Sequence, residues 1–222
     1  MKWVCVLVFF KRSPQFQPLP IITVRTTMDR DMPWLTSMAL LSSDRLVVAD
    51  KFSHSVKLVD VVQDKVLHEL KVGGRPCSLC SLPGNRAAVA LQDKQKILIM
   101  DCANQLSIVG TIAVRGYSKC IAYSNNQLFV LHYFPLKIEI LHMNGTCVKQ
   151  KMLGRFNLDR NDLFLPFELS VMTEGDVTSI FVYDDDNLGI LRLDEDLQEQ
   201  QIFYIPGFLG LLQMVKHLPG LS

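Results

Sequence analysis

Residues 34–60 read WLTSMALLSSDRLVVADKFSHSVKLVD, and this stretch decides the fold. It contains three short runs rich in aliphatic residues, at 35–41, 45–50 and 55–61. A fourth run of the same kind follows at 66–71. Each run ends in polar or glycine-containing residues that favour turns. Runs of this length between turn residues predict four consecutive β-strands.

The same pattern recurs when the sequence is shifted by 41 residues. The aligned positions include Val48, Val89 and Val130 in the second run and Leu58, Ile99 and Ile140 in the third. Another unit aligns at a shift of 134 residues, after an insertion near 154–164. Four strands that recur about every 40 residues are typical of the blades of a β-propeller. We therefore predict an all-β fold made of four-stranded antiparallel blades.

The repeat also predicts how the chain is organised. We expect an N-terminal extension at 1–20 and a propeller over 21–222. The predicted blades are 34–72, 75–114, 115–154 and 165–205, with a partial fifth blade from 206. These units do not complete a ring, so we expect a fragment of a larger protein. Open blade edges would also favour self-association, because unpaired strand edges can pair with another chain.

Composition excludes several classes of protein. Hydrophobic residues make up 49% of the 222 residues, which is enough for a substantial core. The 23 Lys and Arg residues almost balance the 22 Asp and Glu residues, so binding to an anionic partner needs a local patch. The longest apolar run, 3–10, is too short to span a bilayer. Six scattered cysteines and the absence of a signal cleavage site after residue 10 favour a cytoplasmic location.

Three segments carry a resemblance to a known family. They are the stretch at 34–60, DKVLHELKV at 64–72 and GGRPCSLCSLPGNRAAVAL at 73–91. Together they resemble an NHL-type propeller, in particular the C-terminal propeller of invertebrate tripartite-motif (TRIM) proteins. The resemblance covers about 21–220. It implies a six-bladed, TolB-like propeller, incomplete in this chain, that recognises a protein or RNA behind RING, B-box and coiled-coil segments.

The chemistry of the parent family's ubiquitin ligases is not expected in this chain. Cys77 and Cys80 form the only close cysteine pair, and no second pair or histidine lies at zinc-finger spacing. Residues three apart on a strand also point to opposite faces, which makes the pair a poor chelate. We therefore predict no zinc site here.

One acidic segment partly matches a calcium-binding loop. Acidic residues stand at Asp184 and Asp186, glycine at Gly189 and glutamate at Glu195, but Leu188 has no oxygen where a ligand is needed. The repeat places strands, not helices, on both sides of this segment. It is better interpreted as a solvated turn, and we predict no metal and no cofactor.

An enzyme is the alternative function. Some six-bladed propellers are metal-dependent lactonases or esterases, which need carboxylates converging on a central channel. The presumed innermost runs at 35–41, 77–82 and 119–123 offer none. No nucleophile-elbow, P-loop or dinucleotide motif occurs either. We therefore predict a protein without catalytic residues.

Cations recur at one end of the predicted blades. Loops that join successive blades, and loops between the second and third strands, open onto the same face of a propeller. The first class carries Arg30, Arg75, Arg115 and Arg155, and the second carries Lys51, Lys94, Lys96 and Lys137 with Phe52, Tyr133 and Phe134. The predicted partner-binding residues are Arg75, Arg115, Arg155, Lys51, Lys94, Lys96, Tyr133 and Phe134.

Arginine, lysine and aromatic side chains on one rim can pair with carboxylates or phosphates and stack on planar groups. The non-functional interpretation is that these are ordinary solvated loop residues, or that the arginines cap strand carbonyls. The functional interpretation is a recognition module that binds a protein partner or, as the second partner class, RNA.

Overall fold

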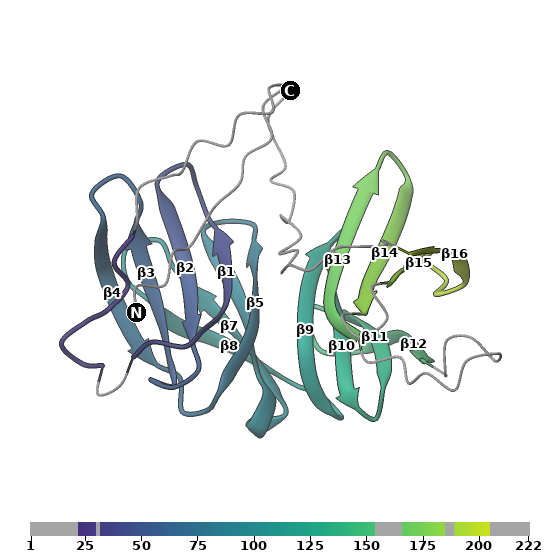
Figure 1. The fold of residues 1–222 in the computed structure, drawn as a ribbon, viewed down its shortest axis with the longest axis horizontal. Coiled ribbons are helices and arrows are strands. Elements are labelled where there is room, and N and C mark those ends of the chain that lie inside the picture. The colour runs from purple at the N-terminus through teal and green to yellow at the C-terminus, as the bar shows by residue number, and fades with distance from the viewer. Residues whose placement is uncertain (1–21, 30–31, 154–165, 185–188, 205–222) are drawn as a thin grey trace.

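The computed structural model describes residues 22–29, 32–153, 166–184 and 189–204 (Figure 1). Within these ranges the chain forms four antiparallel sheets of four strands and one short 3-10 helix, η1 (Gln92–Lys94). Blade A consists of β1 (Leu35–Leu40), β2 (Arg45–Asp50), β3 (Ser55–Asp60) and β4 (Lys65–Lys71). Blade B consists of β5 (Pro76–Leu82), β6 (Arg86–Leu91), β7 (Lys96–Asp101) and β8 (Ser107–Ala113). Blade C consists of β9 (Tyr117–Ser124), β10 (Gln127–Phe134), β11 (Lys137–His142) and β12 (Cys147–Met152). Blade D consists of β13 (Pro166–Glu174), β14 (Val177–Asp184), β15 (Gly189–Leu193) and β16 (Glu199–Tyr204).

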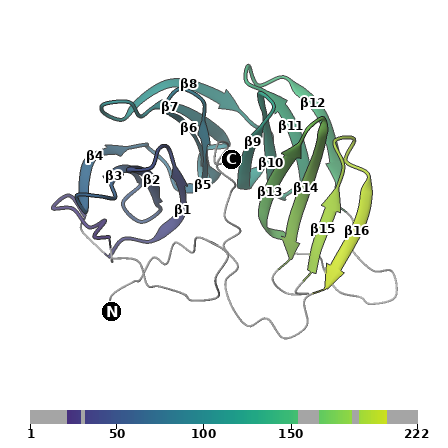
Figure 2. The same cartoon turned by 90° about the horizontal axis from the view of Figure 1, so that it is seen from above.

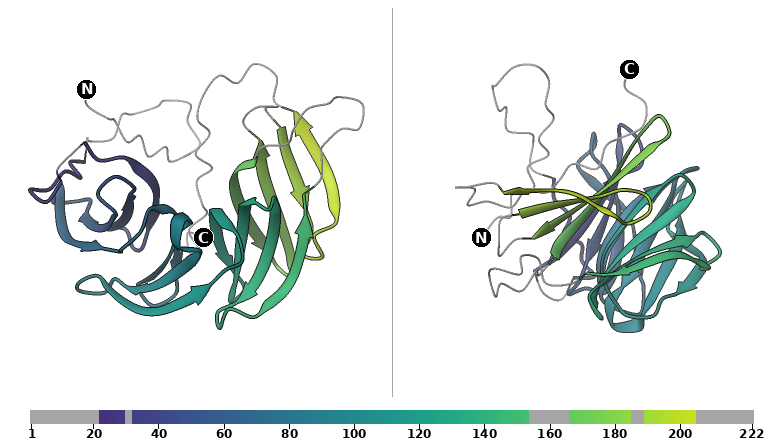
Figure 3. Two further views of the ribbon diagram at one scale, coloured as in Figure 1. Left: turned by 90° about the horizontal axis from the view of Figure 1, so that it is seen from below. Right: turned by 90° about the vertical axis from the view of Figure 1, so that its right-hand side faces the viewer.

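The blades follow one another along an arc in chain order (Figure 2). The first strands of neighbouring blades, β1, β5, β9 and β13, lie side by side along its inner edge. The outer strands β4, β8, β12 and β16 lie along the convex side, as the view from below in Figure 3 also shows. These features confirm the predicted all-β propeller built of four-stranded antiparallel blades.

The cores lie between the blades. Strand β6 shows why, because its alternate residues enter different cores: Val89 packs with residues of blade A, whereas Ala88 and Ala90 pack with residues of blade C. Successive side chains of a strand point to opposite faces, so a strand between two blades must be apolar on both. The second strand of each blade therefore reads as a continuous apolar run rather than an alternating one.

Small polar side chains join the inner strands of the first three blades. Ser37 Oγ accepts a hydrogen bond from the backbone N–H of Leu79 at 3.0 Å. Ser78 Oγ, at the next repeat position, accepts one from the N–H of Ile121 at 3.1 Å. The inner strands of different blades belong to separate sheets, and these hydroxyls provide polar links between them.

The segment Ile22 to Asp29 covers part of the free flank of blade A. Ile22 and Val24 pack against a cluster formed by Leu46, Val48 and Val59. The described residues of this segment form a turn and irregular backbone, not a strand. It nevertheless contributes a carboxylate to the interior of blade A, as described below. Among the residues that the structure describes, no helix has the length and apolarity needed to cross a membrane.

Candidate recognition site

One end of the blades is formed by two kinds of loop. We call this end the loop face: it comprises the β2–β3, β6–β7 and β10–β11 loops and the β4–β5 and β8–β9 junctions. Backbone hydrogen bonds join these segments. The N–H of Val72 donates to His54 O at 2.9 Å, and the N–H of Val114 donates to Gln95 O at 3.0 Å. Each junction is thus fixed against the neighbouring hairpin loop, as the sequence predicts for a propeller.

Four of the predicted cations cluster on the loops of blade B. Arg75, Lys94, Lys96 and Arg115 are all exposed. The backbone N–H of Arg75 donates to the Asp93 carboxylate at 2.7 Å, which fixes the β4–β5 junction beside η1. Within the described part of the chain, none of the four cationic side chains forms an ion pair.

The other predicted cations are placed differently. Lys51 lies on the β2–β3 loop and is only partly exposed. Arg30 and Arg155 lie outside the described residues, as does most of the acidic segment at 184–188. The prediction that Lys137 lies among the exposed loop cations is wrong. Lys137 is the first residue of β11 and is buried, with its ammonium group bonded to the Glu139 carboxylate. A lysine beside a loop is not on the rim when the strand register turns it inward.

Aromatic side chains lie at two places on the loop face. The predicted Tyr133 and Phe134 end β10 and are 53% and 68% exposed. The backbone of Phe134 pairs with that of Tyr117, which is also exposed. On blade A, Trp34 and Phe52 form a second exposed pair, with ring centroids 4.8 Å apart in an edge-to-face arrangement. Sequence reasoning missed Trp34 and Tyr117, since a strand-initiating aromatic residue is equally compatible with a core position.

A buried ion-pair network lies beneath the Trp34–Phe52 pair. The Lys57 side chain is fully buried, and its Nζ donates to Asp29 Oδ2 at 2.7 Å, Asp50 Oδ2 at 2.9 Å and Val24 O at 3.1 Å. These acceptors satisfy the three donors of the ammonium group. Sequence reasoning also missed this network, which brings together side chains from β2, β3 and the segment 22–29.

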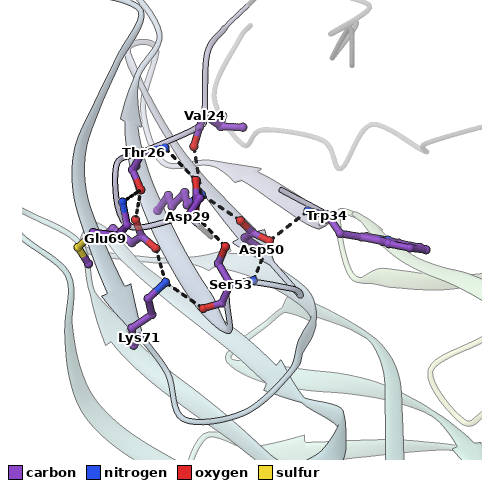
Figure 4. A network of polar contacts seen from close by, with 10 residues as sticks. Val24, Thr26, Asp29, Trp34, Asp50, Ser53, Glu69 and Lys71 are labelled. Carbon is purple, nitrogen blue, oxygen red and sulfur yellow. Dashed lines mark hydrogen bonds and ion pairs between the residues drawn. The ribbon is translucent and has the colours of Figure 1, made fainter. Parts of the chain in front are cut away.

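Further donors stabilise the two carboxylates of the network (Figure 4). Asp50 Oδ1 accepts hydrogen bonds from the backbone N–H groups of Trp34, at 3.1 Å, and Ser53, at 3.3 Å. Asp29 accepts from the N–H of Thr26 at 2.8 Å and from Ser53 Oγ at 2.7 Å. Burial by itself raises the pKa of Asp29, but the hydrogen bonds from Lys57, Thr26 and Ser53 outweigh burial and lower the pKa below its usual value.

Blade C carries a related buried group. His132 Nε2 lies 2.8 Å from Glu139 Oε2, and Lys137 bonds the other oxygen of that carboxylate. His132 is fully buried, and its Nδ1 has no hydrogen-bond partner among the residues that the structure describes. Burial lowers the pKa of His132, although Glu139 opposes this effect. The folded chain therefore protonates this imidazole less readily than an exposed histidine would be protonated.

Two of the described thiols, those of Cys77 and Cys102, are poor nucleophiles. Burial raises the pKa of Cys77 to about 11 and that of Cys102 to about 12, so both are protonated at neutral pH. Cys77 Sγ lies within hydrogen-bonding distance of the Ala90 and Ser118 carbonyls. Within the described ranges, no group of three or more His, Cys, Asp or Glu side chains is arranged to hold a metal ion.

Comparison with known proteins supports the fold. No protein-family model and no curated protein sequence matches the chain. Solved structures with propeller-like folds do match it. Hydrazine synthase of Kuenenia stuttgartiensis matches with a TM-score of 0.61 and 16% identity, over 82% of this chain and 52% of that one. A protein of unknown function from Bacteroides caccae matches with a TM-score of 0.60 and 13% identity, over 82% and 65%.

A third similar structure is BBS1N, solved in complex with ARL6DN. It matches with a TM-score of 0.59 and 16% identity, over 85% of this chain and 57% of that one. The chain thus spans between about half and two thirds of the length of these three proteins. Identities this low establish a shared propeller architecture and no closer relationship.

Proposed function

We propose that the chain is a non-catalytic recognition module that binds a protein partner through the loop face. The observation that carries this proposal is the group of four exposed cations on blade B, Arg75, Lys94, Lys96 and Arg115, none of which forms an ion pair within the described residues. Exposed aromatic side chains flank this group on blades A and C. Charged and aromatic groups held on fixed loops are typical of protein interfaces.

Two considerations support a protein as the partner. BBS1N, which shares the fold, was solved with a protein bound to it. The net charge of this chain is only +1, which gives little general attraction to nucleic acid. We further propose, on the resemblance alone, that the module acts in the cytoplasm as the propeller of a TRIM–NHL-like protein. Self-association through open blade edges stays a prediction that light scattering on the isolated chain tests.

The test is a capture experiment with a charge-reversed loop face. Wild type and Arg75→Glu/Arg115→Glu are immobilised and exposed to extract, and bound proteins and RNA are identified separately. We expect a protein partner that the wild type retains and the double variant loses. Arg86→Glu is the matched control, because Arg86 begins β6 at the opposite end of the blade and is exposed.

Three results would contradict the proposal. Retention of the protein by the double variant would show that the cations are not at the interface. Recovery of RNA alone, with an affinity that falls steeply as salt rises, would indicate nucleic-acid recognition instead. Metal-dependent hydrolysis of lactones or esters by the chain would favour the enzymatic alternative.

A further inference from the structure

Trp34 and Phe52 expose apolar surface where the fold does not require it. Trp34 precedes β1 and is 55% exposed, and Phe52 lies on the β2–β3 loop and is 54% exposed. Their rings contact each other edge to face. This contact leaves much of both rings in water, at a cost that burial in the core would have avoided.

The repeat shows that blades of this protein do not need aromatic residues at these positions. In blade A, the backbone N–H of Lys51 donates to Trp34 O at 2.9 Å. In blade B, the N–H of Gln92 donates to Arg75 O at 3.2 Å, and Arg75 is therefore the equivalent of Trp34. At the same shift of 41 residues, Asp93 is the equivalent of Phe52. Two charged residues satisfy the same backbone geometry in blade B.

The aromatic pair is held in place from below. Asp50 Oδ1 accepts from the N–H of Trp34 at one end of the pair and from the N–H of Ser53, next to Phe52, at the other. Lys57 fixes the second oxygen of Asp50. Lys71 Nζ donates to Ser53 O at 3.0 Å, which adds a further bond to the loop. A platform that is already ordered loses little conformational entropy when a partner binds.

The pair borders the cations of the loop face. Thr36 Oγ1, two residues after Trp34, donates to Pro76 O, directly after Arg75, at 2.9 Å. The loop that carries Phe52 is bonded to the same junction through His54 O and the N–H of Val72. Going from blade A to blade B, the surface therefore passes from the two aromatic rings to the exposed cations Arg75 and Lys94, with the Asp93 carboxylate beside them.

We infer that Trp34 and Phe52 form the anchor site of the loop face, which takes an aliphatic or aromatic side chain from an acidic segment of a protein partner. This inference rests on the proposed function and names the chemistry of the partner. The partner's apolar side chain packs on the two rings, and its carboxylates pair with Arg75 and Lys94. Interfaces commonly divide these roles: an aromatic cluster supplies affinity, and the surrounding charges orient the partner and raise the association rate.

The experiment uses a positional library of acidic peptides of the form Glu-Glu-Xaa-Xaa-Glu-Glu, titrated against the full chain by calorimetry. Only two tryptophans occur, Trp3 and Trp34, so Trp3→Phe makes Trp34 a single fluorescent reporter. We expect peptides with Leu or Phe at the central positions to bind about tenfold more tightly than peptides with Ser, as burial of a large apolar side chain predicts. The Trp34 emission shifts to shorter wavelength only with the apolar peptides.

Two variants separate the anchor from the cations. Trp34→Ser/Phe52→Ser removes the preference for apolar peptides and leaves the affinity for the Ser peptide unchanged, whereas Arg75→Glu weakens both. Ile108→Ser/Val109→Ser is the matched control, because it removes an exposed apolar pair from the outer strand β8 and should keep the preference. Circular dichroism verifies that each variant retains its strands.

The possible failures are distinguishable. Equal affinity of the wild type for Leu and Ser peptides, with both weakened by Arg75→Glu, overturns the anchor and leaves the proposed function standing. If no acidic peptide binds, both the anchor and the proposed protein recognition fail. If single-stranded oligouridylate changes the Trp34 emission and the peptides do not, the rings stack on bases, and the inference of a protein partner is wrong.

Discussion

Lys57 in β3 and Glu139 in β11 occupy the same position of the repeat and carry opposite charges. Each is paired across the sheet with a valine of the preceding strand, Val48 and Val130. The ion-pair partners, Asp50 and His132, also occupy one repeat position. In blade B the same two positions are Leu91 and Leu98, both of which enter an apolar core. The three blades thus place an ion pair, a histidine–carboxylate pair and an apolar pair at the same site.

This equivalence predicts what happens when one partner is removed. Lys57→Leu leaves Asp29 and Asp50 buried without their shared cation, and we expect a loss of about 3–5 kcal/mol in the free energy of unfolding. The triple variant Asp29→Asn/Asp50→Leu/Lys57→Leu introduces the apolar pair of blade B and should recover part of that loss, because it also removes the acceptor of the Trp34 and Ser53 N–H groups. Urea denaturation measures both. A stability of Lys57→Leu equal to that of the wild type would contradict the buried network.

The lowered pKa of Asp29 predicts how the free energy of unfolding depends on pH in acid. Its pKa is lower in the folded chain than its ordinary value of 3.8, because hydrogen bonds from Lys57, Thr26 and Ser53 outweigh the effect of burial. The folded state therefore binds the proton less readily than the unfolded state, and the stabilisation is fully present above pH 3.8. It decreases as the pH falls below that value. The free energy of unfolding, measured by denaturation at several pH values in this range, should depend less steeply on pH in Asp29→Asn than in the wild type. An equal dependence in the two proteins would contradict the prediction.

The lowered pKa of His132 predicts a second pH dependence of the free energy of unfolding, at higher pH. Burial lowers its pKa below the ordinary value of 6.5, against the opposing influence of Glu139. Below pH 6.5 the unfolded state takes up a proton that the folded state does not, so the free energy of unfolding decreases as the pH falls from neutrality. His132→Gln should remove this part of the pH dependence. His142→Gln, a change at an exposed histidine that ends β11, should keep it.

Gly116, in the β8–β9 junction, lies so close to β10 of blade C that the contact is sensitive to one added methyl group. Its φ of +145° is rarely adopted by other residues, and a Cβ would lie 2.7 Å from His132 Nδ1. We expect Gly116→Ala to lower the free energy of unfolding by more than about 2 kcal/mol, since strain and overlap add. At Gly73, where φ is also positive, a Cβ meets nothing within 4 Å. Gly73→Ala should therefore cost less, and equal losses would contradict the crowding at Gly116.

The strands could be predicted from the sequence because propeller blades are local structures. The expected runs at 45–50 and 86–91 coincide with β2 and β6. Within each blade every strand pairs with the next one along the chain, so apolar runs and turn residues carry nearly all the information that each sheet needs. The positions of Arg75 and Arg115 on the loop face follow from the same regularity.

The buried polar groups could not be predicted in the same way. Lys57 lies in a strand that faces neighbouring structure on both sides, and nothing near it in sequence identifies Asp29, 28 residues earlier, as its partner. The sequence places Lys137 on the rim, because an isolated lysine is usually solvated. Only the strand register shows that its side chain is buried and bonds Glu139. The repeat did contain a signal, because position 57 is charged where its equivalent Leu98 is apolar.

The order of the blades has a consequence for biosynthesis. Each inner strand contacts the inner strand of the preceding blade, and hydroxyls such as Ser37 and Ser78 link strands that are adjacent in synthesis. A blade emerging from the ribosome therefore finds its docking surface already made, and the nascent chain can grow by adding finished units to one end.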